Sequence, residues 1–412
     1  MTGSAFVPGR LLVPAPNVDP TAWACVACDQ YTSEPAYWEQ VSQIARGKPS
    51  AYHLVLPECD LRHAGERVPR IHQAMREALA GGVLRPGVEN GFILTVRATQ
   101  SGARMGLVGL IDLDAYDYRK GYRGPVRATE ETIESRLPAR MAIRRGAALE
   151  LSHVLMLADD PAHTVVEPLY AERSRLRKLY DFELMQGGGH LTGYAVTEVA
   201  DLRRVRDALA KLRSPFPFAV GDGNHSLASA KACWEALRAD LPPEEAAAHP
   251  ARFAMVELEN IHDPALRFEP IHRLVTGCDP AALLRDWAAY AAQRGMELDR
   301  EGEGQAMTCL FAGRELPLRV RGSRHALPVG TLQGFLDDWL AAHPEAEIDY
   351  IHGEDSLRNL SARPSSAGFL LPSPDLSALF TAVDQNGALP RKTFSMGHAW
   401  EKRYYMECRE ME

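Results

Sequence analysis

The sequence lacks the segments that would place the protein in a membrane or outside the cell. Its 412 residues contain no apolar run of membrane-spanning length, and residues 1–20 lack the basic start and continuous apolar core of a signal peptide. Its seven cysteines are irregularly spaced and odd in number, so they do not form a disulfide framework. We therefore expect a cytoplasmic protein with reduced thiols and no membrane partner.

Several catalytic motifs are also missing. The chain has no G-x-x-x-x-G-K-[ST] loop and no G-x-G-x-x-G after a strand, so the standard nucleotide-hydrolase and dinucleotide-binding classes lose support. It has neither a G-x-S-x-G elbow nor an H-E-x-x-H helix. The formal net charge of -8 disfavours a nucleic-acid partner. Arginine far outnumbers lysine, which suits the recognition of phosphate or carboxylate groups.

The pattern that is present predicts a mixed α/β fold, with mixed sheets and interleaved helices. Strand-like and helix-like runs alternate along the chain, whose length suffices for two or three domains. Residues 91–98 and 104–112 predict a hairpin. Residues 170–184 resemble a charged helix, and the glycine run after them predicts a boundary between an N-terminal domain, residues 1–188, and a C-terminal domain, residues 189–412.

The stretch from Phe216 to Lys231 reads as a buried strand, a turn with two glycines and the start of a helix. Gly221 and Gly223 permit backbone angles that side chains forbid. A helix that starts after such a turn presents free N–H groups and the positive end of its dipole to an anion such as phosphate. Asn224 or Ser226 can cap this helix.

Two side chains of this turn carry possible chemistry. Asp222 can hold a metal ion or accept a proton, and His225 can donate to a phosphate oxygen or shuttle a proton. An ordinary capped turn, in which Asp222 forms an Asx-turn, accounts for the same residues. The local pattern leaves both interpretations open.

A second stretch, residues 123–157, is rich in arginine. Arg140 and Arg144 fall on one helix face at i, i+4, and together with Arg127 they can grip phosphate oxygens through bidentate hydrogen bonds. Glu130 lies between these arginines in sequence and can serve as a base or magnesium ligand. The alternative is a solvated arginine face balanced by nearby glutamates.

Polar residues also follow or end other predicted strands. Asp29 and Gln30 come directly after a buried strand, where ligands of open α/β sheets bind. His272 and Arg273 lie near the end of a later strand. Lys392 lies in a polar tail punctuated by glycine, where it can serve phosphate or can simply be exposed.

These segments resemble, in one order along nearly the full chain, the bacterial family called domain of unknown function 1015. The resemblance is carried by five pieces: Ala27–Ser33 with Tyr37 and Trp38, Arg127-x-x-Glu130-x-Thr132 with Arg140, Gly221–His225, Phe268–Arg273, and Arg391–Gly397. The commonest central motif of the family is D-G-H-H-R, and here the same places hold Asp222, Gly223, Asn224, His225 and Ser226. The arginine is lost, and Cys28 and Asp29 replace a proline pair, so the chain looks like a divergent branch.

The central motif is also similar to that of the ParB and sulfiredoxin superfamily. Members of that superfamily bind nucleotides or phosphates at this motif, and free serine kinases are among them. This resemblance covers only the central motif, and it implies a core of that kind in the second half of the chain. It also implies ATP or ADP with Mg²⁺ as cofactors.

Residues and resemblance together predict a nucleotide-dependent phosphotransferase that acts on a small hydroxylated metabolite such as free serine. The predicted site has three groups: catalytic Glu130, Asp222 and His225; phosphate- or nucleotide-binding Arg127, Arg140, Gly221, Gly223, Asn224, Ser226 and Lys392; and substrate-binding Asp29, Gln30, Thr132, His272 and Arg273. Two alternatives stay open, namely a non-catalytic module that binds a phosphorylated ligand or a partner, and a phosphoester hydrolase. The sequence leaves the metal undecided, and a homodimer stays open.

Overall fold

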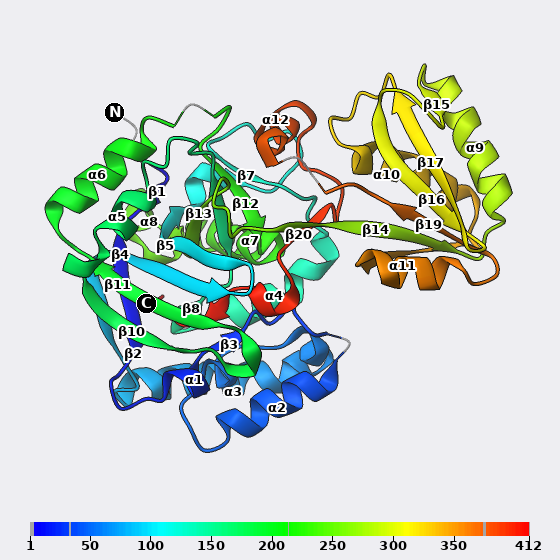
Figure 1. Ribbon diagram of the computed structural model, residues 1–412. Helices are drawn as coiled ribbons and strands as arrows, with labels where there is room; N and C mark the ends of the chain where they lie inside the picture. The colour runs from blue at the N-terminus through cyan, green and yellow to red at the C-terminus, as the bar shows by residue number, and fades with distance from the viewer. Residues whose placement is uncertain (1–3, 33, 213, 374–375, 412) are drawn as a thin grey trace. The chain divides into compact units, whose positions relative to one another are not determined.

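The computed structural model describes residues 4–32, 34–212, 214–373 and 376–411, and it confirms a mixed α/β fold (Figure 1). The chain divides into two compact units. Unit 1 comprises Met1–Arg267 and Met396–Glu412, and unit 2 comprises Phe268–Ser395. Ser33, which ends the first segment of the family resemblance, lies outside the described residues.

The strands of unit 1 form a large mixed sheet and one short pair. They are β1 (Phe6–Val7), β2 (Gly9–Pro14), β3 (Cys25–Val26), β4 (Leu84–Thr99), β5 (Gly102–Asp112), β6 (Tyr116–Asp117), β7 (Val126–Ala128), β8 (Leu149–Leu151), β9 (Leu155–Ala158), β10 (Arg177–Glu183), β11 (His190–Val196), β12 (Phe218–Asp222), β13 (Phe253–Asn260), β21 (Tyr404–Tyr405) and β22 (Cys408–Glu410). The main path of the large sheet runs β6-β7-β12-β9-β13-β5-β4-β2-β22-β8. Strands β6, β7 and β12 are parallel neighbours, whereas β12 and β9 are antiparallel. The predicted hairpin is confirmed as β4 and β5.

Both faces of the large sheet are covered by hydrophobic cores. Successive side chains of a strand point to opposite faces, so neighbouring residues enter different cores. On β4, Phe92 and Leu94 enter one hydrophobic core, and Ile93 between them enters the other. On β13, Met255 and Val256 divide in the same way. A sheet covered on both sides leaves its strand ends as the accessible places for polar chemistry.

The helices of unit 1 are α1 (Pro20–Trp23), α2 (Pro35–Ala45), α3 (Ala64–Ala80), α4 (Leu137–Arg144), α5 (Glu167–Ala171), α6 (Val199–Leu209), α7 (Asn224–Arg238) and α8 (Pro243–Ala248). The helix predicted after the glycine turn is α7. Leu227, Ala230 and Trp234 recur at helical spacing along it and are buried. No helix in the described part of the chain is both long enough and apolar enough to span a membrane.

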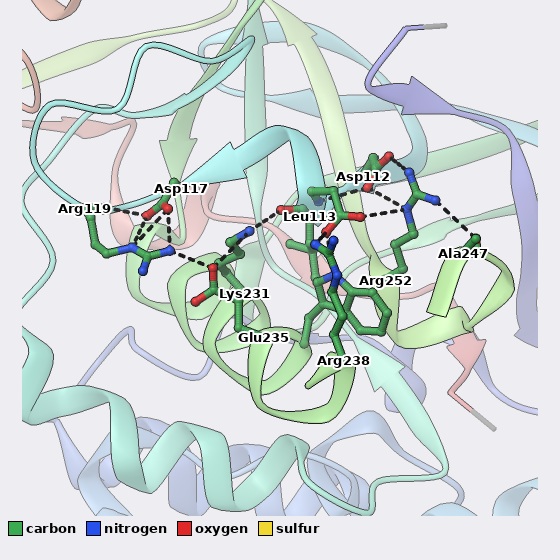
Figure 2. Close-up of polar contacts among 11 residues, drawn as sticks. Asp112, Leu113, Asp117, Arg119, Lys231, Glu235, Arg238, Ala247 and Arg252 are labelled. Atoms are coloured by element: carbon green, nitrogen blue, oxygen red, sulfur yellow. Dashed lines mark hydrogen bonds and ion pairs between the residues drawn. The ribbon is translucent and has the colours of Figure 1, made fainter. Parts of the chain in front are cut away.

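Polar contacts hold α7 along its length against the loop that follows β5. Lys231 Nζ donates to the Leu113 carbonyl at 2.9 Å, and Arg119 joins Asp117 and Glu235 through two ion pairs (Figure 2). The first turn of α7 has different partners.

The segment predicted as a charged helix, residues 170–184, is not a helix along its length: it begins with the end of α5 and a 3-10 turn (Arg173–Arg175) and continues as the strand β10. Tyr180 and Phe182 are buried while Asp181 and Glu183 are exposed, which is the two-residue period of a strand. Strand β10 pairs antiparallel with β11. The glycine run therefore connects two strands of one sheet, and the observed division into units differs from the predicted boundary between residues 188 and 189.

A buried charge cluster lies on the large sheet of unit 1. We use this name for Arg104, Glu257, Glu259, Arg403 and Glu407, all of which are buried. Arg403 bridges two carboxylates, with Nε 2.7 Å from Glu257 and a terminal nitrogen 2.7 Å from Glu407. Arg104 Nε lies 2.8 Å from Glu259.

Unit 2 is built on a smaller sheet with strand order β15-β17-β16-β19-β14-β18. Its strands are β14 (Phe268–Thr276), β15 (Glu297–Asp299), β16 (Gln305–Phe311), β17 (Arg314–Arg321), β18 (Glu347–His352) and β19 (Ser366–Leu370), and β20 (Phe394–Met396) also pairs with β14. Its helices are α9 (Pro280–Gln293), α10 (Pro328–Ala342), α11 (Glu354–Ser361) and α12 (Leu376–Asn386). The pairs β14–β18, β14–β19, β15–β17, β16–β17 and β16–β19 of this sheet are antiparallel.

Candidate functional site

Two parallel strands bring two predicted catalytic carboxylates to one edge of the sheet in unit 1. In the register of β7 and β12, Ala128 pairs with Val220. Glu130 and Asp222 each lie two residues beyond this pair. Because parallel strands end at the same edge, both residues lie where open sheets bind ligands.

Glycine is favoured for a different structural reason at each of the two glycine positions of the central turn. A side chain at Gly221 would collide with Met396 Sδ, so this glycine is required by close packing. Gly223 has a φ of +81°, in the left-handed region that favours glycine, and it is the N-cap of α7. No side chain caps this helix, so its first-turn amides have the arrangement that attracts anions.

Asn224 connects α7 to the end of β7. Its Oδ1 accepts the Thr129 N–H at 3.2 Å, and its Nδ2 donates to Thr129 Oγ1 at 3.3 Å. Thr129 Oγ1 in turn donates to the Val220 carbonyl at 2.5 Å. The Asn224 side chain therefore holds the turn together and is buried. The hydroxyl oxygen of Thr132, a predicted substrate contact, is buried without a hydrogen-bond partner among the described residues.

Asp222 has a cationic partner that the sequence did not reveal. Its Oδ2 lies 3.1 Å from Lys402 Nζ, and its Oδ1 accepts the Gly223 N–H at 2.9 Å. The Lys402 side chain is 6% exposed and the Asp222 side chain 18% exposed. A buried ammonium group and a carboxylate therefore lie directly at the start of α7.

One ring nitrogen of His225, the second residue of α7, is a hydrogen-bond acceptor. Nε2 accepts the Ile133 N–H at 3.1 Å. In the neutral ring the proton must then lie on Nδ1. The His225 side chain thereby joins the start of α7 to the segment that follows Glu130.

Ser226 makes a chain of contacts with residues from distant segments. Its Oγ lies 3.2 Å from His153 Nε2, and His153 Nδ1 lies 2.8 Å from the Tyr405 hydroxyl. Asp29 Oδ2 lies 3.9 Å from His153 Nε2, while its other oxygen accepts from the Gln30 side chain at 3.0 Å. Asp29 and Gln30 thus belong to the same region as Ser226.

The two predicted phosphate-binding arginines lie in different places. The Arg127 guanidinium stacks 4.2 Å from the Phe216 ring centroid, and its Nε donates to the Gly124 carbonyl at 3.0 Å. These partners precede β12 and β7, so the group lies toward the start of the strands, away from Asp222. Arg140 on α4 forms an ion pair with Glu58.

A cavity of about 130 Å³ lies beside the first turn of α7. Arg140, His153 and Ser226 all contribute to its wall. The cavity therefore brings one predicted arginine and one predicted turn residue to a common surface. We call the start of α7, with Asp222, Gly223, His225, Ser226 and Lys402, the α7 site.

Three of the predicted site residues, His272, Arg273 and Lys392, belong to unit 2. His272 Nδ1 accepts the Leu371 N–H at 3.1 Å, and burial lowers the pKa of His272 to about 4, so the ring is neutral. Arg273 is buried and donates to Gln333 and to the carbonyls of the Lys392 segment. The Lys392 side chain is exposed.

The oxygen and nitrogen donors near α7 can be compared with the ligands that the expected Mg²⁺ ion needs. Among the described residues, no group of three or more His, Cys, Asp or Glu side chains is arranged to hold a metal ion. Mg²⁺ commonly binds through one or two protein carboxylates together with substrate phosphates. Asp222 and Glu130 fit that smaller requirement, with the nucleotide supplying the remaining ligands.

Sequence reasoning missed Lys402, His153, Tyr405 and Glu58. Lys402 and Tyr405 lie after the last segment of the family resemblance, and β21 carries Tyr405 beside β3 by a long-range pairing. His153 directly precedes β9, which pairs with β12. These residues reach the surroundings of α7 from segments far away in sequence, and no local sequence pattern predicts such contacts.

The chain belongs to the family described as "Protein of unknown function (DUF1015)". The family model matches residues 8–339, which is most of the chain, and confirms the resemblance noted in the sequence. No curated protein matches the chain.

Solved structures share a distant likeness with the chain. A free serine kinase in complex with AMP has 11% identity and a TM-score of 0.40, covering 72% of this chain and 90% of that one. A conserved hypothetical protein from Pyrococcus furiosus has 11% identity and a TM-score of 0.38, covering 73% and 94%. SbnI from Staphylococcus aureus, truncated at its C-terminus, has 10% identity and a TM-score of 0.39, covering 72% and 85%. Likeness at this level carries no argument about ligands.

Proposed function

We propose that the protein is a nucleotide-dependent phosphotransferase that acts on a small hydroxylated metabolite, with free serine as the first candidate. The observation that carries the proposal is the α7 site. A helix without a side-chain cap begins there at a left-handed glycine, with an ammonium group, a carboxylate and an imidazole around its first turn.

Phosphoryl transfer requires mainly the positioning of groups and the neutralisation of charge. In our proposal the first-turn amides of α7 hold phosphate oxygens, since the helix dipole favours an anion there. Lys402 has three N–H donors, of which Asp222 engages one. The remaining donors can neutralise a phosphate without breaking that pair.

In this proposal Asp222 binds the metal ion and Glu130 is the general base. Asp222 lies next to the proposed phosphate position and would hold Mg²⁺ together with the nucleotide. Glu130, two residues after the end of the neighbouring strand β7, would accept the proton of the substrate hydroxyl. His225 would donate from Nδ1, because its Nε2 is occupied by the Ile133 amide. Of the two arginines, Arg140 lines the adjacent cavity.

The test is to incubate the purified protein with ATP or ADP, Mg²⁺ and serine and to measure phosphoserine. We expect phosphoserine from the natural chain, and a rate roughly 10²–10⁴-fold lower from Glu130→Gln. Arg119→Ala, which alters the far flank of α7, is the matched control and should retain the activity. If no nucleotide in a panel shifts the melting temperature of the natural chain, the proposal fails.

The same experiment separates the alternatives. A non-catalytic binding module would bind nucleotide with both the natural chain and Glu130→Gln but would form no phosphorylated product. A hydrolase would release free phosphate without an acceptor. Each of these results would replace the phosphotransferase while keeping the α7 site as the place of binding.

A further inference from the structure

The cavity beside α7 is suited to an uncharged apolar group. Most of its lining side chains are aliphatic, including Leu54, Met75 and Leu149. Arg140 and Arg144 also line it, but each forms an ion pair with a glutamate. Its volume of about 130 Å³ approaches the ~150 Å³ of a cavity that holds benzene, so a short hydrocarbon chain fits.

One wall of this cavity carries a serine that contacts a positioned histidine. Ser226, His153, Tyr405 and Cys28 all line the cavity. Ser226 Oγ lies 3.2 Å from His153 Nε2, and the other ring nitrogen lies 2.8 Å from the Tyr405 hydroxyl. The Cys28 N–H donates to the same hydroxyl oxygen at 3.2 Å, which fixes the tyrosine.

His153 contacts the Tyr405 hydroxyl through one ring nitrogen and the Ser226 hydroxyl through the other. Burial raises the pKa of Tyr405 well above its ordinary value, so its hydroxyl stays protonated. In the tautomer that the proposal uses, His153 Nδ1–H donates to the Tyr405 hydroxyl oxygen and Nε2 accepts the Ser226 proton. The Asp29 carboxylate, 3.9 Å from Nε2, favours the imidazolium that this transfer creates.

We propose that Ser226 is a nucleophile activated by His153, and that it cleaves esters of short apolar carboxylic acids whose acyl chain occupies the cavity. Ser226 Oγ bonds to the acyl carbon while its proton passes to His153 Nε2. The bond to the alcohol oxygen then breaks, and the leaving alcohol takes that proton. Water repeats the sequence to release the acid, so the reaction requires no cofactor.

Ser229 supplies a matched control within the same helix and cavity. It lines the cavity one turn after Ser226, but its hydroxyl donates to the His225 carbonyl at 2.7 Å. The two serines thus differ mainly in having or lacking a histidine at the hydroxyl. Only Ser226 should be reactive.

The first experiment treats the full natural chain with diisopropyl fluorophosphate and maps the modified peptide by mass spectrometry. The Ser226 oxygen would displace fluoride from phosphorus, with the proton passing to His153. We expect one adduct per chain, on Ser226, and none on Ser229. No adduct on Ser226, or equal adducts on both serines, overturns the proposal without the use of any variant.

The second experiment measures hydrolysis of p-nitrophenyl acetate and butyrate. We expect Ser226→Ala to abolish it, Ser229→Ala to retain it, and His153→Gln to lower it roughly 10²–10⁴-fold. Hydrolysis that survives Ser226→Ala would contradict the proposal. Neither nucleotide nor Mg²⁺ is present, so the result is independent of the proposed phosphotransferase.

Discussion

Two adjacent residues of the C-terminal segment enter two very different polar regions of unit 1. Lys402 reaches Asp222 at the α7 site, at 3.1 Å. Arg403 reaches Glu257 and Glu407 in the buried charge cluster, both at 2.7 Å. Both cations are almost fully buried, with side chains 6% and 3% exposed, so burial alone does not distinguish the regions.

What distinguishes them is the space beside the charges. The buried charge cluster adjoins a cavity of about 10 Å³, too small for more than a single water molecule. The α7 site adjoins a helix start without a side-chain cap and a cavity of about 130 Å³. We infer that the cluster serves stability, and we propose the α7 site, with the space beside it, as the place for a ligand.

The largest effect should follow Arg403→Met, which tests the structural role of the cluster. It would leave Glu257 and Glu407 buried without their shared cation, and breaking a buried ion pair in this way costs about 3–5 kcal/mol. The measurement is urea unfolding. Lys402→Met is the neighbouring control and should cost clearly less, because Asp222 is more exposed. Equal losses from both variants would remove the distinction between the two regions.

A second effect concerns the pH dependence of stability. Burial raises the pKa of Glu259 above its ordinary value of 4.5, even though Arg104 lies 2.8 Å away, and neither carboxylate oxygen has a hydrogen-bond partner among the described residues. The folded chain then keeps a proton that the unfolded chain loses. Stability should therefore fall as pH rises from 4.5 through the raised pKa, by at most about 1.4 kcal/mol per pH unit.

Glu259→Gln isolates this contribution, since glutamine stays neutral at every pH. The free energies of unfolding of the two chains should be similar at about pH 5, and the variant should be the more stable at about pH 8. A constant difference between the two chains across that interval would show that Glu259 does not carry the raised pKa.

Lys402→Met should mainly affect ligand binding. Loss of a charge-assisted hydrogen bond to phosphate would weaken nucleotide binding by about 1.5–3 kcal/mol, or roughly 10–100-fold in Kd. Isothermal titration with ATP and Mg²⁺ measures this directly. Lys231→Met, which alters a lysine on the flank of α7, should leave the Kd unchanged. Similar Kd values for Lys402→Met and the natural chain would mean that Lys402 is structural.

The smallest effect should come from the exposed flank of α7. Arg119 joins Asp117 and Glu235 with a side chain that is 55% exposed, and exposed ion pairs contribute only about 0.2–1 kcal/mol. Arg119→Ala should therefore change the free energy of unfolding slightly, and the difference should shrink in high salt. A loss comparable with that of Arg403→Met would contradict this order.

The parts of the molecule that sequence predicted well are governed by local patterns. The hairpin of β4 and β5 and the strand, turn and helix around Gly223 follow from glycine placement and from apolar period. The prediction of a helix over residues 170–184 was wrong, because Tyr180 and Phe182 alternate with charged residues at the two-residue period of a strand. The helix prediction rested on the many charged residues of this segment and not on its apolar period.

The candidate site was less accessible to sequence for a different reason. Gly223, Asp222 and His225 are contiguous, so their association needed no long-range information. Lys402 lies 180 residues after Asp222 in the sequence. The nearby Tyr405 is positioned by the pairing of β21 with β3. Such contacts depend on strand order, which no spacing of residues within one segment reveals.

The most direct measurement of the central claim is a crystal structure of the protein with ADP and Mg²⁺. The account predicts phosphate oxygens about 3 Å from the first-turn amides of α7 and from Lys402 Nζ. It also predicts the metal ion on Asp222. Nucleotide bound elsewhere on the chain, with the first turn of α7 making no contact to phosphate, would contradict it.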